Sequence, residues 1–120
     1  LAAEGARPED MIVLVDDVNL PLGTVRLRAS GSSGGHNGLE SIEEALGTRE
    51  YARLRMGVGP CPGQRDLAQF VLEPFEDEEW PAVDHMCEVA VDAVLVWARR
   101  GADPAMEMFN RPGAQWDADD

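Results

Sequence analysis

The residues of this sequence that could carry chemistry centre on a glycine-rich stretch, residues 31–42, with the letters GSSGGHNGLESI. His36 is a titratable base, and Asn37 beside it can both donate and accept hydrogen bonds through its amide. At the start of a helix, backbone N–H groups point outward and favour bound anions. Asn37 has two compatible interpretations, a ligand contact or an N-cap that forms a capping box with Glu40. We therefore expect this stretch to line a site.

Two carboxylates form the second candidate group. Asp16 and Asp17 follow the apolar run at residues 11–15, which is predicted to be a strand buried on both faces. Carboxylates at the C-terminal end of such a strand lie where open α/β sheets bind ligands. The alternative is that one or both aspartates form an Asx-turn into residues 19–23. Sequence position alone leaves both interpretations open.

Arginines form the third group, and the chain contains no lysine. Arg26 and Arg28 lie two residues apart in one predicted strand, and Arg53 and Arg55 lie two apart in another. If the two strands are neighbours, the four guanidinium groups make one platform for an anionic ligand, since the arginine fork suits phosphate. The alternative is ordinary solvent-facing strand charge. The predicted strands are residues 24–28 and 51–59.

Composition bounds the class of protein. The 120 residues suffice for one domain, and 44% of them are hydrophobic, without an apolar run long enough to span a membrane. No secretory signal opens the chain, and Cys61 and Cys87 follow no disulfide or zinc pattern, so we expect a cytoplasmic protein. The net charge is −13, but residues 1–60 carry only −3 (9 acids and 6 arginines) and residues 61–120 carry −10 (14 acids and 4 arginines). A basic surface is therefore expected only in the first half.

Helical periodicity places the remaining elements. The spacing of apolar residues predicts a helix over residues 38–46 that Gly47 ends. A long helix is predicted to begin at the acidic residues 76–79 and to end at Arg99, Arg100 and Gly101. Its predicted buried stripe consists of Val83, Cys87, Ala90, Val91, Val94 and Ala98. A short helix over residues 104–109 and a polar tail complete the chain.

These patterns predict an α/β protein, a single domain with a mixed sheet flanked by helices. No Walker loop, metal-ligand cluster, CxxC or GxSxG motif occurs in the sequence. The run Gly57, Val58, Gly59 is too short for a dinucleotide fingerprint. Residue types and spacing alone lead no further than a glycine-rich loop, a strand end with aspartates, and paired arginines.

Three blocks of sequence resemble a known family when taken in order. They are VLVDDVNLPLGTVRLR at residues 13–28, GGHNGL at residues 34–39 and RLRMGVG at residues 53–59. Their order and spacing resemble the bacterial-type peptidyl-tRNA hydrolases, and FVL at 70–72 and AMEMFN at 105–110 also follow that family. The resemblance covers residues 1–111 and leaves residues 112–120 as a polar, flexible tail.

The resemblance implies an activity. The family hydrolyses the ester between a peptide and the 3′ end of tRNA, which recycles tRNA from stalled translation, and it acts as a monomer without a metal or other cofactor. A histidine serves as general base on water, and an aspartate orients that histidine. Asp16 matches the orienting aspartate. Asn37 matches a residue that contacts the substrate, and His36 matches an accompanying histidine that lines the site rather than the general base.

The resemblance also gives the arginines a partner. Arg28 and Arg55 match basic positions associated with the phosphates of tRNA, and Arg26 and Arg53 complete the two pairs. We therefore expect all four arginines to bind peptidyl-tRNA, and we expect no membrane or metal partner.

The departures from the family are as informative as the matches. The N-terminal block of the family, which holds the catalytic histidine, has no counterpart here, and Glu107 stands where the family usually has asparagine. We expect this chain to be the C-terminal two thirds of such a domain, inactive alone, from an active parent enzyme. The alternative is a non-catalytic RNA-binding relative, such as an organellar splicing factor. Retention of Asp16 favours an enzyme, because an RNA-binding surface does not need an orienting aspartate.

Overall fold

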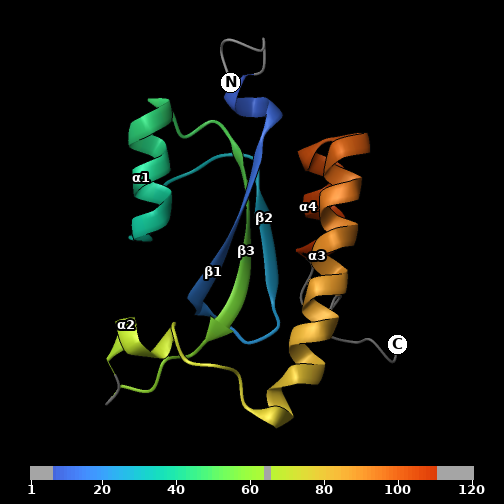
Figure 1. The fold of residues 1–120 in the computed structure, drawn as a ribbon. Coiled ribbons are helices and arrows are strands. Elements are labelled where there is room, and N and C mark those ends of the chain that lie inside the picture. The colour runs from blue at the N-terminus through green and yellow to red at the C-terminus, as the bar shows by residue number, and fades with distance from the viewer. Residues whose placement is uncertain (1–6, 64–65, 111–120) are drawn as a thin grey trace.

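Three strands form the centre of the computed structural model, which describes residues 7–63 and 66–110 (Figure 1). Strands β1 (Ile12–Pro21) and β3 (Ala52–Gly59) are parallel, and β2 (Val25–Arg28) pairs with β3 in the antiparallel direction. The sheet order is β1-β3-β2, so β3 lies in the middle. A mixed sheet with helices on both faces confirms the predicted α/β class.

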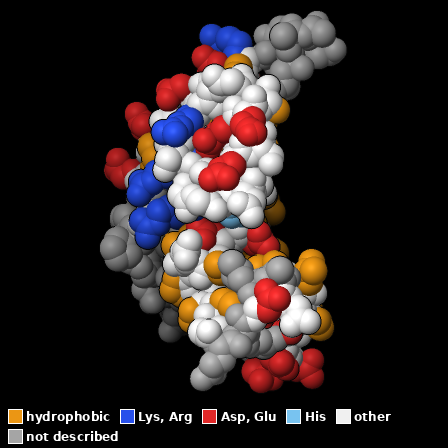
Figure 2. Space-filling model, turned by 90° about the vertical axis from the view of Figure 1, so that its left-hand side faces the viewer, with side chains coloured by type: hydrophobic (Ala, Val, Ile, Leu, Met, Phe, Trp, Pro, Cys, Tyr) orange, Lys and Arg blue, Asp and Glu red, His pale blue; other side chains and the backbone are white. Residues whose placement is uncertain are grey.

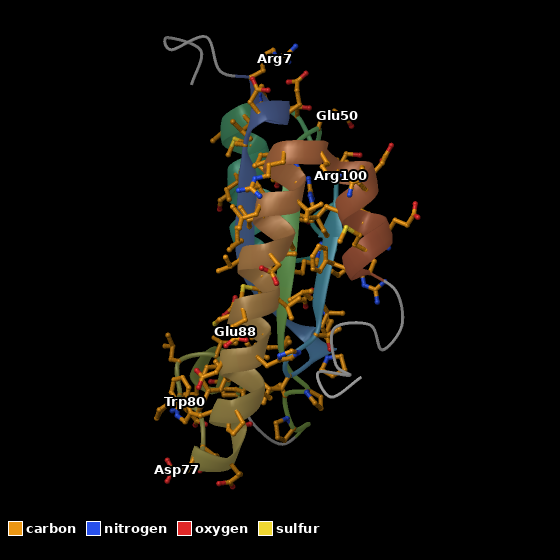
Figure 3. All side chains as sticks on the ribbon, turned by 90° about the vertical axis from the view of Figure 1, so that its right-hand side faces the viewer. Arg7, Glu50, Asp77, Trp80, Glu88 and Arg100 are labelled. Carbon is orange, nitrogen blue, oxygen red and sulfur yellow. The ribbon has the colours of Figure 1, made fainter. Side chains whose placement is uncertain are left out.

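Alternation along the strands decides which face is apolar. Val25 and Leu27 of β2 and Leu54 of β3 are fully buried on one side of the sheet. Helices α3 (Trp80–Arg100) and α4 (Ala102–Phe109) cover that side. Figure 3 shows α3 running along the sheet from Trp80 at one end to Arg100 at the other. The helical residues that complete this core are Met86, Val89, Ala90, Ala93 and Ala105.

The buried stripe of α3 matches the predicted one only in part, since Val83 and Ala90 are buried as predicted. Met86, Val89 and Ala93 are buried, whereas Cys87 is exposed and Val91 is 58% exposed. The helix carries apolar residues on more than one face, so its periodicity allows two stripes about one residue apart. Contact with the sheet selects between them. The helix begins at Trp80, after a 3₁₀ turn, η3 (Asp77–Glu79), that contains the acidic residues.

Helix α1 (Asn37–Leu46) covers the other face of the sheet (Figure 1). Its buried residue is Leu39, and Gly47 ends the helix in the left-handed conformation (φ 73°), both as the sequence predicts. Tyr51, just before β3, is fully buried and directs its hydroxyl at the Leu39 carbonyl and the Glu43 carboxylate (3.5 and 3.4 Å). The glycine-rich loop before α1 therefore lies on the same side of the sheet as this helix.

Strand β1 corrects two predictions. It continues past the aspartates to Pro21, with a register shift against β3 between Asp17 and Pro21. It is also not buried on both faces, because Leu14 is 49% exposed. Within the described residues β1 lies at an edge of the sheet, so strand neighbours cover it on one side only. The Asx-turn alternative is confirmed for Asp17, whose Oδ1 accepts a hydrogen bond from the backbone N–H of Asn19 (2.8 Å).

Gly57 and Gly59 have a structural role at this irregularity. A Cβ atom at Gly57 would overlap the carbonyl oxygen of Pro21, and one at Gly59 would overlap that of Val18. The glycines allow the last part of β1 to cross β3 at close range. The run Gly57–Gly59 is thus explained by backbone approach.

The side-chain amide of Asn110 helps to tie the C-terminal end of the described chain to the sheet. Asn110, just after α4, accepts a hydrogen bond from the Leu27 N–H (2.8 Å) and donates one to the Leu27 carbonyl (2.7 Å). This pairing satisfies backbone groups at the outer edge of β2. Glu107, which the resemblance marks as a departure from the family pattern, is exposed on α4.

The remaining described elements are short. They are η2 (Pro8–Asp10) and α2 (Leu67–Phe70). None of the helices within the described ranges combines the length and apolarity needed to cross a lipid bilayer. The expectations for the first residues and for the tail at 112–120 lie outside the described part of the chain.

Candidate functional site

The two neighbouring aspartates of β1 have different environments. Asp17 is 5% exposed, and its Oδ2 accepts a hydrogen bond from Nη1 of Arg55 (2.9 Å) while its Oδ1 caps the Asn19 N–H. The side chain of Asp16 is 57% exposed, and Nε2 of His36 lies 3.8 Å from its Oδ1. Only the Asp16 carboxylate is therefore available to a ligand or to a further catalytic group.

His36 lies between β1 and α1. Its Nε2 is 2.9 Å from the backbone oxygen of Asp16, and its Nδ1 is 3.3 Å from the backbone nitrogen of Leu39. His36 is thereby the N-cap of α1. The predicted capping box of Asn37 and Glu40 is wrong, because the ring of His36 occupies the cap and Glu40 instead pairs with the hydroxyl of Ser33 (3.3 Å).

Asn37 is the first residue of α1 and is exposed. Its side-chain amide forms no hydrogen bond with any other residue of the described ranges 7–63 and 66–110. The residue before it, His36, contacts the backbone oxygen of Asp16, which links the start of α1 to β1. Asn37 can therefore donate to, or accept from, a ligand placed at the start of α1.

The four arginines of β2 and β3 share one face of the sheet. The antiparallel register pairs Arg26 with Arg55 and Arg28 with Arg53. Directly paired residues in an antiparallel ladder project to the same side. The two strands are neighbours, which is the condition for the four arginines to form one platform. The four side chains nevertheless have different surroundings.

Arg53 is inside the protein. It is 1% exposed, and its guanidinium lies 4.1 Å from the centroid of the Tyr51 ring and 3.6 Å from the carboxylate of Glu43. It also donates to the backbone oxygens of Arg49 (2.8 Å) and Ser32 (3.3 Å). The prediction that Arg53 presents charge to tRNA does not fit this position, because a phosphate in solvent cannot reach the guanidinium.

Arg55 holds the glycine-rich loop from the same strand. Besides its ion pair with Asp17, it donates through Nη2 to the backbone oxygens of Ser33 (3.0 Å) and Ser32 (3.4 Å). A Cβ atom at Gly34 would lie 3.3 Å from this nitrogen, and Gly34 has a φ of 62°, so glycine suits both the space and the backbone. Arg53 and Arg55 together position the loop that precedes His36.

Of the four arginines of β2 and β3, Arg26 and Arg28 are the two whose side chains are not used within the described fold. Arg26 is half-buried and Arg28 is exposed, and neither forms an ion pair or hydrogen bond within the described part of the chain. Figure 2 shows basic side chains along one edge of the face covered by α1, beside acidic side chains over that helix. The cationic surface predicted for the first half of the chain therefore keeps only two of the four strand arginines, Arg26 and Arg28.

A cavity of about 660 Å³ lies beside Asp16, between the ends of β1 and β3 and the first turns of α3. Its wall combines apolar side chains, such as Leu14 and Met56, with acidic ones, such as Glu79. The exposure of Leu14 results from this opening. Sequence reasoning missed the cavity, because the apolar run at residues 11–15 predicts a strand covered on both faces.

The arrangement defines the chemistry that these residues can perform. Asp16 can accept a hydrogen bond from an imidazole, Asn37 can bind a polar substrate group, and Arg26 and Arg28 can attract phosphate. His36 already uses both ring nitrogens. Within the described ranges, no group of three or more His, Cys, Asp or Glu residues is placed to hold a metal ion.

Comparison with known proteins links this arrangement to a family. The chain is 50% identical over 101 residues to a peptidyl-tRNA hydrolase of Pseudothermotoga lettingae, covering 84% of this chain and 54% of the relative. It is 47% identical over 103 residues to a peptidyl-tRNA hydrolase of Thermus thermophilus, covering 86% of this chain and 56% of the relative. The chain thus spans about half the length of the curated relatives it matches.

Solved structures agree with the sequence comparison. A crystal structure of peptidyl-tRNA hydrolase from Acinetobacter baumannii superposes with a TM-score of 0.79 at 25% identity, covering 92% of this chain and 56% of that one. A family model described as peptidyl-tRNA hydrolase matches residues 2–117. Since this match covers nearly all of the sequence, the chain belongs to the peptidyl-tRNA hydrolase family.

Proposed function

We propose that this chain forms part of the active site of a hydrolase that cleaves the ester between a peptide and the 3′ end of tRNA. Family membership supports the reaction, and the observation that carries it is the exposed carboxylate of Asp16, which lies 3.8 Å from the imidazole of His36, the residue before Asn37. The proposed substrate is peptidyl-tRNA from stalled translation. The protein then works in the cytoplasm, as a monomer and without a metal or other cofactor.

In the proposed reaction, water attacks the ester carbonyl and gives its proton to an imidazole base. The C–O bond to the ribose then breaks, and the ribose oxygen takes the proton. Asp16 accepts a hydrogen bond from that imidazole, which orients the ring and stabilises its charged form. His36 is not this base, because each of its nitrogens already has a backbone partner. His85 lies on α3 and is not among the residues around the cavity at Asp16. The proposal therefore requires an imidazole other than these two.

Asn37 and the open arginines bind the substrate in this proposal. Attack on the ester places negative charge on the carbonyl oxygen, and an amide N–H that is already in position stabilises that charge. Arg26 and Arg28 extend along the same face and contact the phosphates of tRNA. The roles of Asp16 and Asn37 are taken from the matching family positions, and the geometry is compatible with both.

A chimera tests the activity. This chain replaces the matched half of the Thermus thermophilus relative, and hydrolysis of an N-acetyl-aminoacyl-tRNA is followed. We expect turnover, and we expect Asp16→Asn to lower kcat by a factor of about 10²–10⁴, since the amide no longer stabilises a charged imidazole. Glu88→Gln, the same chemical change on the outer face of α3, serves as the matched control and retains turnover (Figure 3).

The same experiment separates the enzyme from an RNA-binding relative. A folded chimera that binds tRNA but does not release the N-acetyl amino acid would overturn the proposed reaction. Undiminished turnover in the Asp16→Asn chimera would remove Asp16 from the mechanism while leaving the reaction in place. The chain alone is assayed in parallel for tRNA binding.

A further inference from the structure

The ring of His36 has two hydrogen-bond partners whose chemical roles cannot change. The backbone nitrogen of Leu39 carries a hydrogen and only donates, and it faces Nδ1 at 3.3 Å. The backbone oxygen of Asp16 only accepts, and it faces Nε2 at 2.9 Å. Nδ1 must therefore offer a lone pair, and Nε2 must carry the proton. Both contacts are made at once only by the neutral ring in the Nε2–H tautomer.

The surroundings of the ring include one charge that opposes this state. The carboxylate of Asp16 lies 3.8 Å from Nε2 and favours an imidazolium. Protonation of Nδ1, however, would set two N–H groups against each other at Leu39 and would place a positive charge at the positive end of the dipole of α1. Glu40 in the first turn of α1 is paired with Ser33. Retaining the N-cap therefore requires the ring to be neutral.

Gly38 provides an independent sign that this ring position is built into the fold. A Cβ atom at Gly38 would lie 3.0 Å from Cε1 of His36 and 3.3 Å from its Nδ1. Gly38 is the second residue of α1, where glycine is a poor helix former compared with alanine. The glycine leaves the space in which the ring turns back over the first turn.

We propose that His36 is a positioning residue, a neutral Nε2–H imidazole that joins the start of α1 to β1 and so holds Asn37 beside Asp16. One nitrogen caps the helix that begins with Asn37, and the other binds the backbone of the residue that carries the open carboxylate. The tautomer can be tested on this chain alone, whereas the contribution of the His36 link to catalysis rests on the proposed function.

Nitrogen NMR of the ¹⁵N-labelled chain tests the tautomer. The chain has two histidines, so signals that disappear in His36→Asn belong to His36. At about pH 8.5, where an unperturbed imidazole is neutral, we expect Nδ1 to resonate as a nonprotonated nitrogen and Nε2 as a protonated one. Shifts averaged between the two tautomers, or a protonated Nδ1, would overturn the assignment.

Three substitutions separate the two contacts. Asparagine places its oxygen near the position of Nδ1 and can keep the cap, glutamine places its amide near the position of Nε2 and can keep the bond to Asp16, and alanine loses both. We expect His36→Ala to raise the unfolding equilibrium constant by a factor of about 5 to 10, with His36→Asn and His36→Gln each recovering part of the loss. If neither variant is more stable than His36→Ala, the ring does not make these contacts in solution.

Gly38→Ala sharpens the assignment because its effect depends on the ring. Beside His36 the added methyl group requires the imidazole to move by a few tenths of an ångström, so we expect the change to be less favourable there than in the His36→Ala background. In the His36→Ala background the same change is expected to lower the unfolding equilibrium constant by a factor of about 4, which is the ordinary helix preference of alanine over glycine. Equal effects in the two backgrounds would show that the ring does not occupy this space.

The chimera connects the link to catalysis. We expect His36→Ala to lower kcat/KM about tenfold, with partial recovery in His36→Asn and His36→Gln. Because neither asparagine nor glutamine can act as a base at neutral pH, this recovery would come from positioning alone. Loss of all turnover in the three variants would make His36 a catalytic residue and would overturn the proposal. If the unsubstituted chimera is inactive, the proposed function fails, while the NMR experiment still decides the tautomer.

Discussion

The arginine pairs of β2 and β3 have the same residue type and spacing and face the same side of the sheet, yet their environments are opposite. Arg26 and Arg28 extend from an edge strand and have no partner among residues 7–63 and 66–110. Arg53 and Arg55 extend from the central strand and donate to backbone oxygens of the glycine-rich loop. One pair is available to a ligand, and the other belongs to the structure.

The difference follows from what lies above each strand. The loop at residues 31–36 passes over β3 and directs the carbonyl oxygens of Ser32 and Ser33 at the guanidinium groups of Arg53 and Arg55. Buried backbone oxygens without a donor are costly, and one guanidinium supplies five N–H groups. Among residues 7–63 and 66–110, no loop carbonyl accepts a hydrogen bond from Arg26 or Arg28 of β2. A cationic side chain at the centre of this sheet thus serves as a backbone donor, and only the edge remains for phosphate.

The largest expected effect of this comparison is on stability at Arg53. Arg53→Met removes one of the donors to each of the oxygens of Arg49 and Ser32, and it removes the buried cation beside Glu43. We expect the free energy of unfolding to fall by about 3 kcal/mol, as when one member of a buried pair is removed. Urea denaturation followed by circular dichroism measures the loss.

The matched control is the same change on the edge strand. Arg28 is exposed and pairs with Arg53 across the ladder, so Arg28→Met should alter the free energy of unfolding by no more than about 0.5 kcal/mol. Equal losses in the two variants would abolish the distinction between a structural pair and a free pair.

A second test concerns the contact between Asp17 and Arg55. Both side chains are largely buried, and the 2.9 Å bond joins β1 to β3. A double-mutant cycle of Asp17→Asn and Arg55→Met should give a coupling energy of about 2 kcal/mol, within the range for hydrogen bonds to charged groups. A coupling near zero would mean that Arg55 is as free in solution as Arg26, and would return it to the phosphate-binding surface.

Much of the scaffold could be predicted from local pattern. The end of α1 at Gly47 and the alternation of β2 were both predicted, because helix termination and strand alternation depend on residues close in the sequence. The register of α3 could not be predicted. Met86 is buried and Cys87 is exposed, although both suit an apolar stripe, since contact with the sheet makes that choice.

The structure brings several of the proposed site residues close together, but the sequence did not predict their contacts. His36 is the N-cap in place of Asn37 because of a backbone oxygen 20 residues earlier in the chain, at Asp16. Arg53 is buried because it donates to the carbonyls of Arg49 and Ser32. Every residue has such a carbonyl, so the residue types do not show which ones will be its partners. The sequence therefore indicates which side chains lie near one another, whereas contacts with the backbone, which the sequence does not show, determine the role of each.

The third prediction addresses the free pair directly. Double substitution of Arg26 and Arg28 by glutamine should weaken tRNA binding about tenfold, or about 1.4 kcal/mol, because two phosphate contacts are lost. The slope of log affinity against log salt should fall by about two units. Filter binding of the chain at several salt concentrations measures both. An unchanged slope would exclude these arginines as phosphate contacts, leaving the comparison with β3 purely structural.

The smallest expected effect is on the pKa of Tyr51, the only tyrosine in the chain. This pKa reports on the contact between Tyr51 and Arg53. Burial raises the pKa of Tyr51 above its ordinary value, and the cation of Arg53 over its ring partly opposes that rise. Because the folded state favours the neutral phenol, this contribution to stability is fully present below about pH 10 and is lost as pH rises through the folded pKa. Absorbance of the tyrosinate should therefore titrate at higher pH in the native chain than in the unfolded one.

The two arginine pairs should affect this titration differently. Arg53→Met removes the opposing cation and should raise the pKa of Tyr51 further, whereas Arg28→Met should leave the pKa unchanged, with circular dichroism checking that each variant stays folded. A shift in the Arg28 variant of the same size as that in the Arg53 variant would show that both cations act on the phenol from a distance. Contact of Arg53 with the ring would then contribute nothing specific, and burial of its guanidinium would have to be explained by the loop carbonyls and Glu43 alone.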